Sequence, residues 1–96
     1  MKKIKTLLEE KGFTVKKYGD EFELQQYTPA GEDWHINLDK LEDIVEYAED
    51  FDPEEEFEIW YEAGRNGVGG VPKITELWKD QLWKQELLNS IAKELK

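Results

Sequence analysis

Acidic side chains are concentrated in residues 41–64, which hold eleven carboxylates and no lysine or arginine. All 13 basic residues lie elsewhere, so the formal net charge of -10 belongs almost entirely to this stretch. Carboxylates at this density could bind hard cations, form acid–base pairs for hydrolysis, or attract a basic protein surface. The eleven are Glu42, Asp43, Glu46, Glu49, Asp50, Asp52, Glu54, Glu55, Glu56, Glu58 and Glu62.

The spacing of these acids favours a binding surface. Two predicted helices each carry acids at i, i+4 and i+8, and four like-charge pairs of this kind cost about 1–2 kcal/mol. With a rise of about 1.5 Å per residue, the helices present roughly one charge per 3 Å, close to the one charge per about 3.4 Å of a DNA strand. We therefore expect a basic nucleic-acid-binding protein, such as a nuclease effector, as the partner. The predicted partner-binding residues are Glu42, Glu46, Glu49, Asp50, Glu54, Glu55, Glu58 and Glu62.

A solvated face without a partner is the alternative explanation. Acids are common on protein surfaces, and they favour helix N-termini because of the helix dipole. Basic side chains from other parts of the chain could also fold back and neutralise part of the charge. The candidates are Lys2, Lys3, Lys5, Lys79 and Lys84.

Metal binding has weaker support. Asp50, Asp52, Glu54 and Glu55 offer the hard oxygen ligands that Ca²⁺ and Mg²⁺ prefer. The spacing of an EF-hand loop is absent, however, and Asp52-Pro53 is better explained as the start of a helix. We expect no metal and no cofactor.

Catalytic side chains are scarce. The chain has one histidine (His35), one serine (Ser90), one arginine (Arg65) and no cysteine. Ser90 falls late in a predicted helix and His35 on a strand surface, so a nucleophile–base pair is not expected. A pair of carboxylates could hydrolyse a substrate, but a chain of 96 residues leaves little room for a cleft. We expect a non-enzymatic protein.

Composition limits the compartment and the partners. The first residues lack the apolar core of a signal peptide, and no apolar run approaches the roughly 20 residues of a membrane span. Direct binding to nucleic acid needs a basic footprint, which this acidic chain does not offer. We expect a cytoplasmic protein that contacts neither a membrane nor nucleic acid directly.

The predicted fold is α+β in a single domain, residues 1–96. An N-terminal helix ending at Gly12 precedes a three-stranded antiparallel meander, with turns at residues 19–20 and 28–31. The alternation of Trp34, Ile36 and Leu38 with polar residues gives the sheet one apolar face. Three helices then pack on this face.

Capping signals predict where these helices begin. Asp39 followed by Glu42 predicts a capping box for the second helix. Asp52-Pro53 with Glu55 predicts an N-cap, a proline at the first position and an acid at the third for the third helix. A glycine-rich connector, residues 65–73, leads to the last helix, and an anion at that helix N-terminus is a less favoured alternative to a plain connector.

The last helix is predicted over residues 74–95, with an apolar stripe of Ile74, Leu77, Trp78, Leu82, Leu87, Leu88, Ile91 and Leu95. Trp83 lies off this stripe, so it is either a second buried face or an exposed anchor for a partner or a second copy. Tyr18 and Tyr27, on the outer sheet face, pose the same question, and core or edge packing is favoured for all three. The alternative function is an interaction or assembly module, a homodimer or adaptor, that uses apolar contacts of this helix.

Residues 50–95 carry the segments D-F-D-P-E-E and W-Y-E-A-G-R-N-G-V-G-G-V-P, followed by the leucines of the last helix. This half of the chain resembles small proteins of bacterial phages and mobile elements. By size, charge and lack of catalytic groups, the chain also resembles anti-CRISPR and antirestriction inhibitors, a likeness of type and not of motif. The resemblance implies an inhibitor acting in the cytoplasm of a bacterial host, and it assigns no residue a role.

Overall fold

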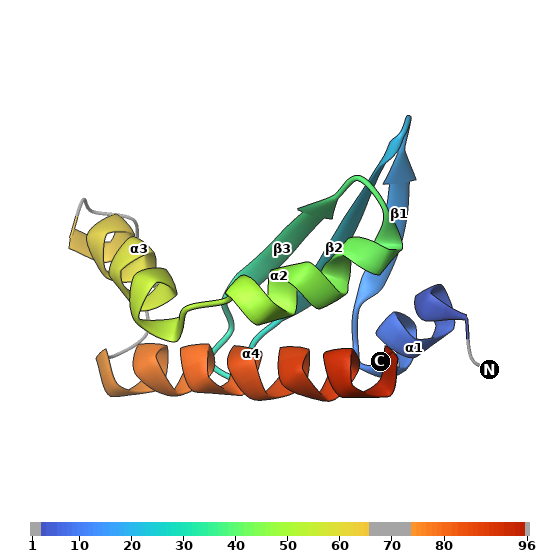
Figure 1. Ribbon diagram of the computed structural model, residues 1–96. Helices are drawn as coiled ribbons and strands as arrows, with labels where there is room; N and C mark the ends of the chain where they lie inside the picture. Colours follow the sequence, from blue (N-terminus) through green and yellow to red (C-terminus); the bar gives the residue numbers. More distant parts are fainter. Residues whose placement is uncertain (1–2, 66–73, 96) are drawn as a thin grey trace.

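The computed structural model describes residues 3–65 and 74–95 and confirms the predicted α+β fold. Figure 1 shows α4 running along the base of the molecule, with α1 beside its C-terminal end and α3 beside its N-terminal end. The elements in chain order are α1 (Ile4–Glu10), β1 (Thr14–Tyr18), β2 (Glu21–Tyr27), β3 (Asp33–Leu38), the 3-10 turn η1 (Leu41–Asp43), α2 (Ile44–Asp50), α3 (Pro53–Arg65) and α4 (Ile74–Leu95).

The sheet is the predicted antiparallel meander, in the order β1-β2-β3. Leu24 at its centre pairs with Val15 on one side and Ile36 on the other, so apolar residues line up on one face. Gly19, with φ +58°, allows the tight turn between β1 and β2. Gly31, with φ +95°, closes the turn before β3, where its N–H donates to the Thr28 carbonyl at 2.9 Å.

The core forms where α1, α2 and α4 cover the apolar face of the sheet. Strand residues meet helix residues there, and burying each large apolar side chain stabilises the fold by roughly 1.5–3 kcal/mol. The helix α3 packs on α4, with the Phe57 and Trp78 rings 5.7 Å apart. The apolar core members that are 0% exposed are Leu8, Leu24, Ile44, Leu88 and Ile91.

The two predicted helix starts have different outcomes. The capping box at Asp39 and Glu42 is wrong, because the chain enters α2 through η1 and the Lys40 N–H donates to Asp43 Oδ2 at 3.3 Å. The shift by one residue follows from β3, which extends to Leu38 and leaves two residues for the exit from the sheet. The start of α3 is confirmed, since Asp52 Oδ1 accepts the Glu54 N–H at 2.9 Å.

The predicted length of α4 is confirmed, but its apolar stripe is wrong in the middle. Leu82 is 43% exposed, whereas Asp80, Gln81 and Lys84 are buried. The reason is geometric: steps of three and four residues from Leu77 to Leu88 pass through residues 80, 81 and 84 and miss residue 82.

The predictions that Trp83, Tyr18 and Tyr27 pack in the core or at an edge have different outcomes. Trp83 is half-buried and packs edge-on to Trp34, with ring centroids 6.0 Å apart, so the core alternative holds. Tyr18 and Tyr27 are exposed on the outer face of the sheet, and the expectation that they pack is wrong. The predicted connector covers residues 65–73; Arg65 instead ends α3, and residues 66–73 lie outside the described part of the chain. In the part of the chain that is described, no helix combines the length and apolarity needed to cross a membrane.

Candidate protein-binding surface

The eight residues predicted to bind a partner are all exposed, and together they define the acidic face. They lie on η1, α2 and α3, which follow one another in the chain. Glu42 belongs to the 3-10 turn, so it does not stand in strict α-helical register with Glu46 as predicted. Two other acids of the stretch, Asp43 and Glu56, are half-buried and do not contribute to this face in full.

The acidic face consists of two segments and not of one straight row. Figure 1 shows α2 and α3 running in different directions, with the chain turning at Phe51 and Asp52. The charge spacing that resembles a nucleic-acid strand therefore holds along α2 and along α3 separately. A partner that covers both segments has to follow the bend between them.

The lysines within residues 3–65 and 74–95 do not neutralise most of this face. Lys84, one of the predicted neutralising residues, does pair with one acid of the 41–64 stretch, Glu56, but it is fully buried and reaches none of the eight acids of the face. Lys2 lies outside the described residues. Six acids of the face form no ion pair with any Lys or Arg that the structure describes, namely Glu42, Glu46, Asp50, Glu54, Glu55 and Glu58.

Shallow depressions with acidic rims interrupt the face. One, of about 320 Å³, lies between the end of β3 and α2, where Asp39, Asp43, Glu46 and Asp50 surround Tyr47. Another, of about 150 Å³, continues from Tyr47 and Asp50 to Asp52, Glu55 and Glu56 at the start of α3. Such depressions can admit lysine or arginine side chains, whose apolar stems would contact Tyr47 while their charged ends meet carboxylates.

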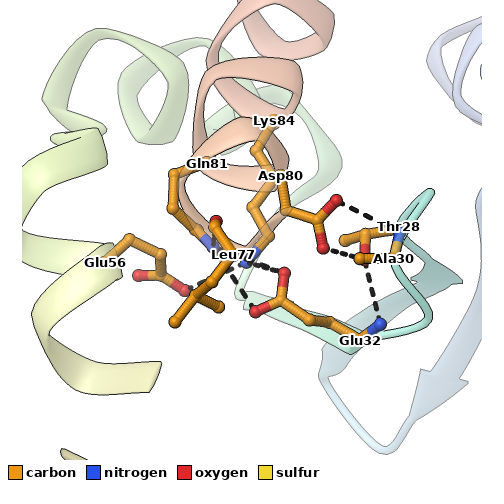
Figure 2. Close-up of polar contacts among 8 residues, drawn as sticks. All are labelled: Thr28, Ala30, Glu32, Glu56, Leu77, Asp80, Gln81 and Lys84. Carbon is orange, nitrogen blue, oxygen red and sulfur yellow. Dashed lines mark hydrogen bonds and ion pairs between the residues drawn. The ribbon is translucent and has the colours of Figure 1, made fainter. Parts of the chain in front are cut away.

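A buried polar cluster, which the sequence did not predict, links the 28–32 turn to α4 (Figure 2). Asp80 binds the turn twice: the Thr28 hydroxyl donates to Oδ2 at 2.5 Å, and the Ala30 N–H donates to Oδ1 at 3.2 Å. The same Thr28 hydroxyl accepts the Glu32 N–H at 2.9 Å. These bonds satisfy the backbone of the turn where α4 covers it.

The other half of the cluster surrounds Lys84. Its Nζ lies 3.7 Å from Glu32 Oε2 and 3.5 Å from Glu56 Oε1, and the Trp34 and Trp60 ring centroids are each 5.3 Å away. Gln81 Nε2 donates to the Leu77 carbonyl at 2.9 Å and lies 3.3 Å from Glu32 Oε2. Because Glu56 belongs to α3, the buried ammonium joins α3 to the 28–32 turn through α4 (Figure 2).

Glu32 has the most perturbed ionisation in this cluster. Its pKa is raised to about 7, mainly by burial and also by the neighbouring Asp80 carboxyl, while Lys84 and Gln81 act in the opposite direction. Glu32 therefore changes its charge near neutral pH. Since Glu32 is 4% exposed and Lys84 0%, the cluster holds the fold together and does not offer a substrate site.

The structure does not bring the two catalytic candidates, His35 and Ser90, together. His35 lies on the outer face of the sheet, where its Nε2 is 2.9 Å from Asp33 Oδ1 and this contact raises the His35 pKa. Ser90 lies on α4 beneath the opposite face, and its hydroxyl accepts a hydrogen bond from Lys11 Nζ at 2.9 Å. Among the described residues, no three metal-ligating side chains are grouped so that they could hold an ion.

Comparison with known proteins finds no protein family, no curated protein and no solved structure that matches this chain. The resemblance to proteins of mobile elements and to anti-CRISPR or antirestriction inhibitors therefore stays a prediction.

Proposed function

We propose that this protein is a non-enzymatic inhibitor that binds a basic, nucleic-acid-handling protein through its acidic face. The observation that supports the proposal is the set of six exposed carboxylates on η1, α2 and α3 without an ion-pair partner among the described lysines and arginines. Such an arrangement keeps like charges close together, which costs stability. A basic partner would supply the missing counter-charges.

The proposed mechanism is competition with nucleic acid. A channel that binds phosphates is lined with lysine and arginine, and the acidic face offers these residues carboxylates instead. A net charge of -10 would steer the protein towards such a channel and speed association at low salt. The class of inhibitor would be that of anti-CRISPR or antirestriction proteins, acting in the cytoplasm of a bacterial host.

Charge reversal tests this proposal. The face variant changes Glu46, Asp50, Glu54 and Glu58 to Lys. The matched control changes four exposed acids outside the face to Lys, with the same shift in net charge: Glu9, Asp20, Glu21 and Glu86.

Each protein is added to a Cas9–guide complex and to a restriction endonuclease, and both binding and DNA cleavage are measured. We expect the parent and the control variant to bind and inhibit one of these enzymes, and the face variant to do neither. Binding should weaken steeply between about 50 and 500 mM salt, because screening shortens the range of the attraction. Inhibition by the face variant at the level of the parent would show that the acidic face is not the interface.

A second candidate function is assembly through apolar contacts of α4. The supporting observation is Leu82, an apolar side chain that is 43% exposed on this helix. Trp83 no longer supports it, because its ring packs on Trp34. A mass of twice 11.4 kDa by light scattering, reduced to a monomer by Leu82→Ser, would favour this function over charge-driven binding.

A further inference from the structure

An open groove of about 440 Å³ separates α3 from α4 at the edge of the acidic face. The α3–α4 groove is lined by Glu54, Phe57, Glu58, Thr75 and Trp78. Two half-buried aromatic rings form its floor, with Phe57 and Trp78 packed edge-to-face at an interplanar angle of 88°. The groove is therefore apolar below and carboxylate-lined along the α3 side.

Apolar surface continues beyond the floor on both helices. Tyr61 stacks on Phe57 one turn along α3, with ring centroids 6.0 Å apart, and is 38% exposed. Leu82 lies one turn along α4 from Trp78, on the same side of that helix, and is 43% exposed. An apolar floor of this kind beside acidic groups is typical of a surface that receives a partner side chain.

We propose that the α3–α4 groove docks a large apolar side chain from a lysine- or arginine-rich segment of the partner. This inference rests on the proposed function, because Glu54 and Glu58 belong both to the groove and to the acidic face. Charge complementarity with Glu54 and Glu58 favours a basic segment. A leucine or phenylalanine side chain would cover the Phe57 and Trp78 rings while flanking cations meet the two carboxylates.

A second copy of this chain fits the groove less well. It would bring another net charge of -10 against a rim that already carries Glu54 and Glu58. Like charges held close together disfavour association unless they are screened. A basic partner segment relieves the same repulsion, so it is the occupant that the charges favour.

The test uses two synthetic peptides and two variants of the full chain. One peptide is lysine-rich, helical and carries leucines on one face, and its companion has serine in place of every leucine. Thr75→Trp fills the groove without changing any charge. Thr6→Trp is the matched control, because Thr6 is an exposed threonine on α1, away from the groove.

Calorimetry gives the affinities, and NMR follows the Trp78 indole N–H. We expect the parent to bind the leucine peptide about tenfold more tightly than the serine peptide, because one apolar side chain is transferred from water into the groove. Thr75→Trp should reduce the leucine-peptide affinity to that of the serine peptide, whereas Thr6→Trp should preserve the difference. Only the leucine peptide, and not the serine peptide, should shift the NMR signal of the Trp78 indole N–H strongly.

The possible failures can be told apart. Equal affinities for the two peptides, or a leucine preference that survives Thr75→Trp, would overturn the proposed docking in the groove. Salt-sensitive binding of the serine peptide would in that case still support the acidic face as a binding surface. A third outcome is binding of the leucine peptide that Thr75→Trp abolishes and that salt does not weaken. It would support docking in the groove and overturn the proposed charge-driven function. No binding of either peptide, or a dimer that Thr75→Trp converts to a monomer, would overturn the proposed occupant.

Discussion

Replacing Glu32 with glutamine is expected to stabilise the protein above neutral pH and to leave its stability nearly unchanged in mild acid. The folded state raises the Glu32 pKa from 4.5 to about 7, mainly through burial and the adjacent Asp80 carboxyl. The folded protein therefore holds the Glu32 proton more tightly than the unfolded chain. This contribution to stability is fully present below about pH 4.5 and is lost as the pH rises through about 7.

The magnitude follows from the size of the shift. At about 1.4 kcal/mol for each pH unit, the difference between 4.5 and about 7 corresponds to about 3 kcal/mol of lost stability at high pH. Glutamine has nearly the shape of the protonated carboxyl group and stays neutral at every pH. Glu32→Gln should therefore exceed the parent by up to about 3 kcal/mol near pH 8, and by less than about 1 kcal/mol near pH 5.

The assay is urea unfolding of both proteins at a series of pH values, analysed as the difference in free energy of unfolding at each pH. Taking the difference cancels the titration of groups that the substitution leaves alone. Glu21→Gln serves as the control, because Glu21 is exposed at the start of β2 and its variant should show no such trend. A variant that is less stable than the parent by the same amount at both pH values would refute the reasoning and would indicate that Lys84 keeps Glu32 ionised.

Three further predictions concern the buried lysine, the cap of α3 and the acidic face. Lys84→Met should destabilise the protein by about 3–5 kcal/mol near pH 8, because it leaves the Glu32 and Glu56 carboxylates without their buried counter-charge; an unchanged urea midpoint would contradict this. Asp52→Ala should cost about 1 kcal/mol through loss of the bond to the Glu54 N–H, with Asp50→Ala, at the end of α2, as the comparison. The melting temperature should rise with added NaCl, because screening relieves repulsion worth about 1 kcal/mol among the three i, i+4 acid pairs of α2 and α3; a flat or falling salt profile in differential scanning fluorimetry would show that the charges are already compensated.

Local signals in the sequence were enough for most of the fold. The strand over Trp34, Ile36 and Leu38 follows from strict alternation, because successive side chains on a strand point to opposite faces. The start of α3 follows from Asp52-Pro53, because both the cap and the fixed proline φ act within one turn of the chain. Exposure of the eight side chains of the acidic face also follows directly, since ionised groups are costly to bury without partners.

The buried cluster lay beyond such signals. Gln81 and Lys84 occupy the inward side of α4, but a polar residue is assigned to the surface unless its buried partners are known. Their partner Glu32 lies about 50 residues earlier in the chain, in a turn whose position against α4 depends on the whole sheet. The regular spacing from Leu77 to Leu88 was the one local hint. Following hydrophobicity instead of this spacing placed Leu82 on the buried stripe, although its side chain is exposed.

The sequence by itself determined that the protein carries a concentrated negative charge, since charge is a sum over residues and needs no coordinates. Only the tertiary structure decided which acids remain uncompensated. It placed Lys84 in the interior, where it meets Glu32 and Glu56, and left Glu46 and Glu58 without an ion pair to any described lysine or arginine. The physical reason is that ion pairing depends on distances of a few ångströms between segments far apart in the chain, and packing alone sets those distances.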